Sequence, residues 1–164
     1  MIGEIKIRER GPTPGLLKRA FNAMKQKCFL AAGIFWHKEF RVKHFTKSGA
    51  TEYGYTPRKT SGKYGFKSSY TGRKLREKGH TKPLVWSGES MALTRMRDVR
   101  ATSKRGRVVI RAPRFNTQPK NSTIDMRYEM TRVTEREAVQ MIRVYDHSLD
   151  SQLRAFRATQ SKTI

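Results

Sequence analysis

One segment restricts how this chain can fold: residues 46–82 contain six glycines and almost no aliphatic side chains. A segment with so few apolar residues cannot fill a hydrophobic core, and it shows no sustained helical or strand period. The core must therefore come from the residues on either side. We expect residues 46–82 to form a long, basic, extended arm or loop within a single domain of residues 1–164, with a short helical turn near residues 71–77.

Helical periodicity marks the segments before and after this arm. Apolar residues recur every three or four positions over residues 17–35, which predicts a long N-terminal helix after a Gly- and Pro-rich turn at residues 11–15. Thr134 and Glu137 have the spacing of a capping box, and apolar residues at helical spacing follow over residues 138–156. We therefore expect a C-terminal helix that starts at this cap.

Strand patterns lie between the two helices. Val99 and the run 108–110 flank the turn-forming sequence 103–106, which predicts a β-hairpin. Further strands are expected at residues 124–133 and 2–7. The predicted order is long N-terminal helix, basic extended arm, antiparallel β-sheet and C-terminal helix. This is an α+β fold in which helices cover one side of the sheet.

The charge of the chain indicates anionic or acidic partners. Lys and Arg number 36 against 13 Asp and Glu, for a formal net charge of +23. Residues 41–82 alone hold 12 basic and 2 acidic residues. Such an excess opposes compaction by self-repulsion and does not suit a cytosolic enzyme with a neutral substrate. The single Cys28 excludes an intrachain disulfide, and no apolar run approaches the length of a membrane span, so we expect a soluble protein.

The sequence contains no recognisable catalytic or cofactor-binding motif. Its four histidines are scattered without a metal-site spacing, and it has no phosphate-binding loop, dinucleotide-binding glycine motif or serine elbow. We expect no catalytic residue, no cofactor and no metal. The chain is predicted not to be an enzyme.

Tyrosines are interleaved with cations along the arm. Ammonium and guanidinium groups neutralise phosphates or acidic side chains, and tyrosine rings stack on bases or on arginine. The pattern alone leaves open a solvated face, contact with protein and contact with nucleic acid. The candidate contact residues are Tyr53, Tyr55, Arg58, Lys59, Lys63, Tyr64, Lys67, Tyr70, Arg73, Lys74 and Arg76.

An apolar cluster ends the basic segment. A proline that favours an extended approach is followed by three apolar residues and a Ser-Gly turn. We interpret the cluster as an anchor that fixes the far end of the arm in the fold, an interpretation compatible with the simpler one that it begins a core strand. The candidate anchor residues are Pro83, Leu84, Val85, Trp86 and Gly88.

These motifs together resemble a known family over about residues 15–155. The chain is similar to neck or tail-completion proteins of tailed bacteriophages, of the virion-morphogenesis kind. The motifs that carry the resemblance are a long helix ending in Trp36, the run Lys43-His44-Phe45, Tyr53-x-Tyr55-x-x-Arg58, Tyr64-x-x-Lys67 with Tyr70, and Pro83-Leu84-Val85-x-Ser87-Gly88.

The resemblance implies a structural virion protein of the head–tail joint, acting in the neck, in tail completion or as a tail terminator. It implies a homo-oligomeric ring, a hexamer by resemblance only, between the connector or portal-side proteins and the tail-tube proteins. Packaged DNA is a further contact left open. Such a protein is made in the host cytoplasm and located in the neck of the virion. The alternative, which composition alone favours, is a nucleic-acid-binding protein of ribosomal or nucleoid type.

Overall fold

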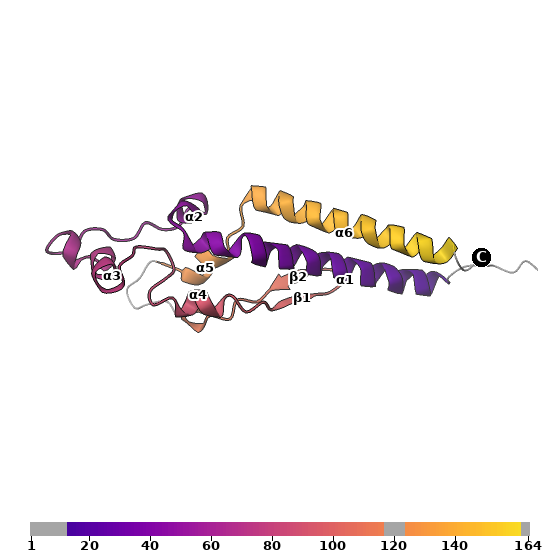
Figure 1. The fold of residues 1–164 in the computed structure, drawn as a ribbon, viewed down its shortest axis with the longest axis horizontal. Coiled ribbons are helices and arrows are strands. Elements are labelled where there is room, and N and C mark those ends of the chain that lie inside the picture. The colour runs from indigo at the N-terminus through magenta and orange to yellow at the C-terminus, as the bar shows by residue number, and fades with distance from the viewer. Residues whose placement is uncertain (1–12, 117–123, 162–164) are drawn as a thin grey trace, which may run out of the picture.

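A computed structural model describes residues 13–116 and 124–161. Its α+β architecture confirms the fold class expected from the sequence. Figure 1 shows a long central helix, α1 (Pro14–Glu39), with the C-terminal helix α6 (Glu135–Ser161) along one side and a β-hairpin along the other. The strand predicted at residues 2–7 lies outside the described residues.

The long helix α1 begins at a polar cap and buries one side against α6. The Thr13 hydroxyl accepts a hydrogen bond from the Leu16 amide at 3.4 Å, and Pro14 occupies the first helical turn, where its missing N–H costs nothing. Met24 and Cys28 are buried, the latter completely. Because 26 residues of helix reach well past the core, the helix positions elements at both of its ends.

The predicted hairpin is confirmed. Strands β1 (Val99–Ala101) and β2 (Gly106–Val108) pair antiparallel, with Val99 opposite Val108. The hairpin lies very close to α1, because Gly33 leaves room for it: a Cβ on Gly33 would be 2.6 Å from Cγ1 of Val99. A small helical residue at this position therefore sets the distance between helix and sheet.

The prediction of a strand at residues 124–133 is wrong. This segment contains a short helix, α5 (Met126–Thr131), capped by Asp125, whose carboxylate accepts a hydrogen bond from the Tyr128 amide at 2.9 Å. The alternation of apolar and polar residues in this segment resembled a strand. In the helix, the adjacent residues Glu129 and Met130 are both buried, which a half-exposed strand would not allow.

The cap predicted for the last helix is confirmed. The Glu137 amide donates to the Thr134 hydroxyl at 3.2 Å, and the Thr134 amide donates to the Glu137 carboxylate at 3.2 Å. These reciprocal bonds satisfy amides that the first turn of a helix leaves unpaired. Helix α6 accordingly begins at Glu135.

The apolar core lies at the C-terminal end of α1. There the helix continues into a 3₁₀ turn (Arg41–Phe45) and meets the anchor residues, a second 3₁₀ turn (Pro113–Asn116) and α5. The core is strongly aromatic. Its buried apolar members are Trp36, Phe40, Phe45, Tyr53, Tyr55, Leu84, Val85, Ala112, Phe115 and Met130.

The basic arm is partly helical rather than extended throughout. It contains α2 (Lys47–Glu52), a 3₁₀ turn (Phe66–Ser68) and α3 (Tyr70–Lys78), the last of which corresponds to the predicted helical turn. A further short helix, α4 (Glu89–Leu93), follows the anchor. Figure 1 shows α3 near one end of the molecule, beyond the end of α1. Within residues 13–116 and 124–161, no helix combines the length and apolar character needed to cross a membrane.

Candidate partner interface on the basic arm

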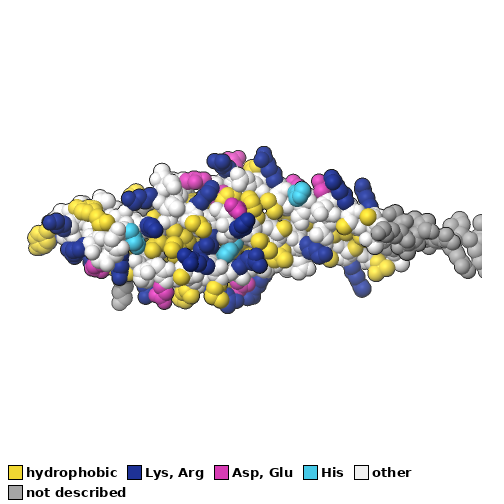
Figure 2. Space-filling view, viewed as in Figure 1, with side chains coloured by type: hydrophobic (Ala, Val, Ile, Leu, Met, Phe, Trp, Pro, Cys, Tyr) yellow, Lys and Arg dark blue, Asp and Glu magenta, His cyan; other side chains and the backbone are white. Residues whose placement is uncertain are grey.

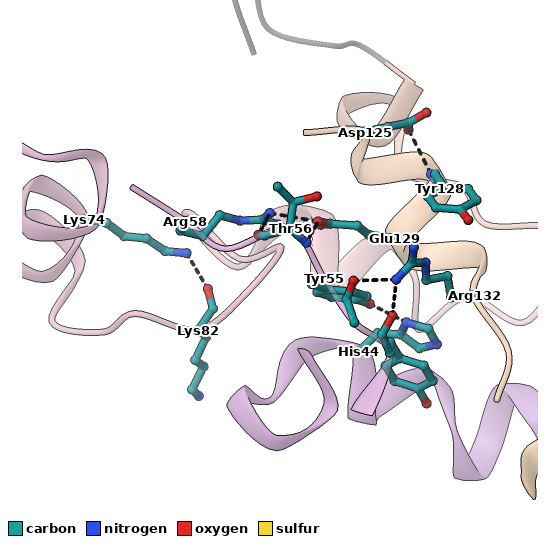
Figure 3. Close-up of polar contacts among 12 residues, drawn as sticks. His44, Tyr55, Thr56, Arg58, Lys74, Lys82, Asp125, Tyr128, Glu129 and Arg132 are labelled. Carbon is teal, nitrogen blue, oxygen red and sulfur yellow. Dashed lines mark hydrogen bonds and ion pairs between the residues drawn. The ribbon is translucent and has the colours of Figure 1, made fainter. Parts of the chain in front are cut away.

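The arm is held at its root by a buried ion pair between Arg58 and Glu129 of α5. Both guanidinium Nη atoms contact the carboxylate, at 2.8 and 2.5 Å, and the Glu129 carboxylate also accepts the Thr56 amide at 3.1 Å (Figure 3). The side chains of Arg58 and Glu129 are 21% and 3% exposed. Two parallel charge-assisted bonds fix the direction of the chain as it leaves the core. Arg58, predicted to contact a partner, is thus largely engaged within the fold.

Tyr53 and Tyr55 lie in the core, which corrects the prediction that they contact a partner. The Tyr53 ring stacks on His44 with centroids 3.9 Å apart, and its hydroxyl donates to Glu137. The Tyr55 hydroxyl and Nδ1 of His44 share a hydrogen bond of 2.5 Å. Because the 3₁₀ turn after α1 brings His44 beneath them, these tyrosines complete the core instead of facing outward.

Burial determines the protonation of this aromatic cluster. Desolvation lowers the pKa of His44 to about 4, so its imidazole is neutral at physiological pH. Desolvation, followed by the hydrogen bond to Glu137, raises the pKa of Tyr53 well above its usual range. The rings of His44 and Tyr53 are therefore both uncharged in the core.

Beyond the root, residues 59–79 form a compact tip in which the chain turns back toward the core. The Ser69 hydroxyl caps α3 by accepting the Gly72 amide at 3.0 Å. Gly72 lies against the preceding turn so closely that a Cβ would be 2.0 Å from the Phe66 carbonyl oxygen. Gly79 ends α3 in the left-handed conformation (φ 68°), which glycine adopts without strain. The glycines that made this segment look unstructured thus form its tight turns.

Most of the predicted contact residues lie on the surface of this tip. The Tyr64 side chain is the most open of the aromatic ones, at 78% exposure, and Tyr70 is 45% exposed. Arg73 forms only a loose ion pair with Glu77, at 3.9 Å. Figure 2 shows Lys and Arg side chains at the arm end of the molecule and spread along the rest of this face. The exposed members of the predicted set are Lys59, Lys63, Tyr64, Lys67, Tyr70, Arg73 and Arg76.

Lys74 is the exception among the cations of the tip, because it is buried. Its side chain reaches back from α3 and donates to the Lys82 carbonyl oxygen (Figure 3). Burial and the nearby Arg58 lower the pKa of Lys74 to about 8. Among the described residues, no carboxylate forms an ion pair with it. Lys74 therefore links α3 to the chain at Lys82, at the base of the tip. The electrostatic cost of this link is the burial of an ammonium group near Arg58.

The anchor residues lie where the arm returns to the core. Pro83, Leu84 and Val85 are buried, and Leu84 adopts a positive φ of 53°, an unusual conformation for a residue with a branched side chain. Trp86 is only half-buried and contacts the arm rather than the centre of the core. Gly88 has φ 90° and begins the turn into α4.

Trp86 connects the anchor to the arm tip. The Arg73 guanidinium lies over its ring at 5.2 Å from the centroid, and the Tyr70 ring is 5.4 Å away. Tyr70 and Trp86, together with Arg58, Lys74 and Phe115, line a cavity of about 490 Å³ between the tip and the core. Arg58, Tyr70 and Lys74 of the predicted set are thus brought together here, at the base of the tip.

Three residues outside the predicted set organise the arm root: Glu129, Arg132 and Glu137. Arg132 donates to the backbone carbonyls of Tyr53 and Gly54, and its guanidinium lies 4.6 Å from the Tyr128 ring centroid. Glu137 was marked in the sequence by its capping-box spacing with Thr134, and the sequence offered no local signal for Glu129 or Arg132. Within the described ranges, no group of three His, Cys, Asp or Glu side chains is arranged to hold a metal ion.

Comparisons with known protein families, with curated proteins and with solved structures find no match to this chain.

Proposed function

We propose that this protein is a structural component of the head–tail joint of a tailed bacteriophage, in which copies form a ring between the connector and the tail. The observation that carries the proposal is the arm: a compact basic tip fixed at both ends, with cations and tyrosines presented outward. A preformed surface of this kind suits docking to a neighbouring subunit, because little conformational entropy is lost when it binds.

The charges of the tip favour acidic protein surfaces as its partners. Lys59, Lys63 and Lys67 are exposed, and residues 41–82 contain only two acidic residues. Electrostatic complementarity of this kind directs subunits into register. In the proposed neck, the tip contacts the connector side, the tail-tube side or the adjacent copy, and the protein has no catalytic role. It is made in the host cytoplasm and incorporated into the virion.

The proposal is tested by reversing charges on the tip. We expect the variant Lys59→Glu, Lys63→Glu, Lys67→Glu to fold normally, because these exposed side chains contribute little to stability, and to be absent from virions of the phage that encodes it. The matched control reverses Arg154 and Arg157, which are exposed on α6. Normal incorporation of the tip variant would refute the contact.

Contact with nucleic acid is the second candidate, and Tyr64 favours it, because an exposed ring between Lys63 and Lys67 could stack on a base while the lysines neutralise phosphates. This function predicts that the purified protein binds duplex or single-stranded DNA with an affinity that falls steeply with salt. Tight, salt-sensitive binding that is lost in the tip variant, together with normal incorporation of that variant into virions, would select this alternative.

A further inference from the structure

A second cavity at the base of the tip is basic. It lies between α2, α3, the chain at residues 54–58 and the returning segment 81–83, and its volume is about 450 Å³. This volume is within the usual range of small-molecule sites. Its lining contains no Asp or Glu but four cationic side chains: Lys47, Arg58, Lys74 and Lys82. We call it the basic cavity.

Lys74 gives the basic cavity a buried positive charge that the fold does not neutralise. The residue is 5% exposed, and its ammonium group donates to the Lys82 carbonyl oxygen (Figure 3). A lysine ammonium has three N–H donors. Among the described residues, this carbonyl is the one hydrogen-bond acceptor of Lys74. Two of the three donors of Lys74 therefore remain for a ligand.

The other cations of the basic cavity differ in how they are paired. Both Nη atoms of Arg58 bind the Glu129 carboxylate, so the charge of Arg58 is already balanced. Lys47 and Lys82 are exposed, and no carboxylate of the described residues forms an ion pair with either. A partly enclosed site that holds unbalanced positive charge attracts anions.

Two threonine hydroxyls add uncharged donors to the basic cavity. Thr56 and Thr81 both line it, and within residues 13–116 and 124–161 neither hydroxyl forms a hydrogen bond. The hydroxyl of Thr71, which also lines the cavity, is already used, because it donates to the Lys59 carbonyl oxygen at 2.8 Å. The cavity thus offers both ammonium and hydroxyl donors beyond those that the fold itself uses.

These donors surround the basic cavity instead of lying on one side of it. Thr56 belongs to the chain that leaves the core, Lys74 to α3, Thr81 and Lys82 to the returning segment, and Lys47 to α2. A carboxylate presents two oxygens in one plane. A phosphate presents three or four oxygens in a tetrahedral arrangement, each of them a strong acceptor. Donors on several sides therefore suit a phosphate group better than a carboxylate.

The cavity of about 490 Å³ on the other side of Lys74 is less suited to an anion. Its walls are mainly apolar and include Leu84, Val85 and Phe115. An anion loses its hydration against such walls. The ammonium of Lys74 binds the carbonyl of Lys82, and Lys82 lines the basic cavity and not the apolar one. An anion that pairs with Lys74 is therefore expected on the basic side.

We propose that the basic cavity binds a phosphate group, with Lys74 as its central cation and the hydroxyls of Thr56 and Thr81 as further donors. The phosphate belongs to a small phosphate ester or to a nucleic-acid backbone, two sources that share this chemistry. The site goes beyond the proposed function and does not depend on it. Tyr64, on which the nucleic-acid alternative is based, does not line the cavity. The bound anion offsets the cost of burying the Lys74 charge.

Two variants remove different parts of the site. Lys74→Met removes the buried charge, and Thr56→Val with Thr81→Val removes both hydroxyls while keeping every charge and the shape of the side chains. The matched control is Lys78→Met, which removes one positive charge from an exposed position of α3 outside the cavity. Circular dichroism verifies that each protein is folded. The measurements are made at pH 7, where Lys74 is mostly protonated because its pKa is about 8.

Isothermal titration calorimetry with inorganic phosphate, at constant ionic strength, gives the affinity of each protein. We expect the unmodified protein and Lys78→Met to bind phosphate with the same affinity. Lys74→Met and the double threonine variant should each bind it about tenfold more weakly, because each loses hydrogen bonds to an anion. Since the threonine variant keeps the net charge, its loss separates a built site from general attraction by a basic protein.

Two further titrations identify the source of the phosphate. A nucleoside monophosphate that binds more tightly than inorganic phosphate supports a small ester as the ligand. A single-stranded oligonucleotide that displaces inorganic phosphate, and that binds more weakly to the Lys74 and threonine variants, supports a nucleic-acid backbone. In both cases the site is the basic cavity.

Three results would overturn the proposal. The first is that inorganic phosphate does not bind to the unmodified protein. The second is equal affinity in all four proteins, which means that net charge alone attracts the anion. The third is that glutamate binds as tightly as phosphate and is weakened by the same substitutions, which makes the cavity a site for the carboxylate of an acidic partner. These results are independent of whether the charge-reversed tip variant enters virions.

Discussion

The hydroxyl of Tyr53 donates a hydrogen bond to the carboxylate of Glu137 inside the core, although the two residues are 84 positions apart in the chain. Through the same carboxylate, Glu137 accepts the Thr134 amide at the start of α6. One buried side chain thus joins the root of the basic arm to the N-terminus of the last helix.

Removal of this side chain should destabilise the fold more than removal of the cap alone. We expect Glu137→Ala to lower the free energy of unfolding by about 3 kcal/mol, because it loses the cap and leaves the Tyr53 hydroxyl buried without an acceptor. Thr134→Ala should cost about 1 kcal/mol. Urea unfolding measures both, with the exposed Glu135→Ala as control. Equal losses for Glu137→Ala and Thr134→Ala would show that the Tyr53 bond contributes nothing.

The ion pair at the arm root gives a second prediction. Arg58→Ala leaves the Glu129 carboxylate in the core with the Thr56 amide as its one remaining partner among the described residues, and we expect a loss of about 3 kcal/mol in the free energy of unfolding. Lys59→Ala, at the adjacent exposed position, should change stability by less than about 0.5 kcal/mol. Thermal and chemical unfolding of both variants compare the two sites. A small effect at Arg58 would mean that the other contacts of the arm root, those of Tyr53, Tyr55 and Arg132, are enough to hold it.

His44 should make stability depend on pH. Its pKa is about 4 when folded and about 6.5 when unfolded, so the unfolded chain binds the extra proton between these values. Stability is therefore fully present above pH 6.5 and is lost as the pH falls toward 4, by up to about 3 kcal/mol. His44→Phe, which can keep the ring stacked on Tyr53, should lack this part of the slope, whereas His147→Gln should retain it. Identical slopes for all three proteins would contradict a buried neutral imidazole.

The charged Lys74 side chain should lower the free energy of unfolding. We expect Lys74→Met to raise the free energy of unfolding by about 1 kcal/mol at pH 7, because a methionine avoids burial of an ammonium group without a carboxylate partner. The advantage should shrink as pH rises above about 8, where the folded lysine loses its proton. Arg76→Met, on the exposed side of α3, is the control. A destabilised Lys74→Met protein would show instead that the bond to Lys82 outweighs desolvation.

The sequence predicted those features whose signals are local. The capping box at Thr134, the helical spacing along α1 and the glycine turn of the hairpin each involve residues within a few positions of one another, and all three are present in the structure. Period-two alternation misled at residues 124–133, because the Asp125 cap and burial of adjacent residues outweighed it.

The organisation of the arm could not be predicted in the same way. Arg58 and Glu129 are 71 residues apart, so nothing local marks them as partners. Tyr53 and Tyr55 were grouped with the surface tyrosines because they share the basic composition of the arm. Only the three-dimensional position of His44 shows that they belong to the core. The exposed members of the predicted set are accordingly those from Lys59 onward, with Lys74 as the exception.

The complete burial of Cys28 has a practical consequence. It is the single cysteine of the chain, and it lies near Tyr145 on the side of α1 that meets α6. A water-soluble thiol reagent can reach its Sγ atom only when that contact separates. The rate of labelling, followed by mass spectrometry, therefore measures how often the two long helices part in the native protein, at one known atom and without any substitution.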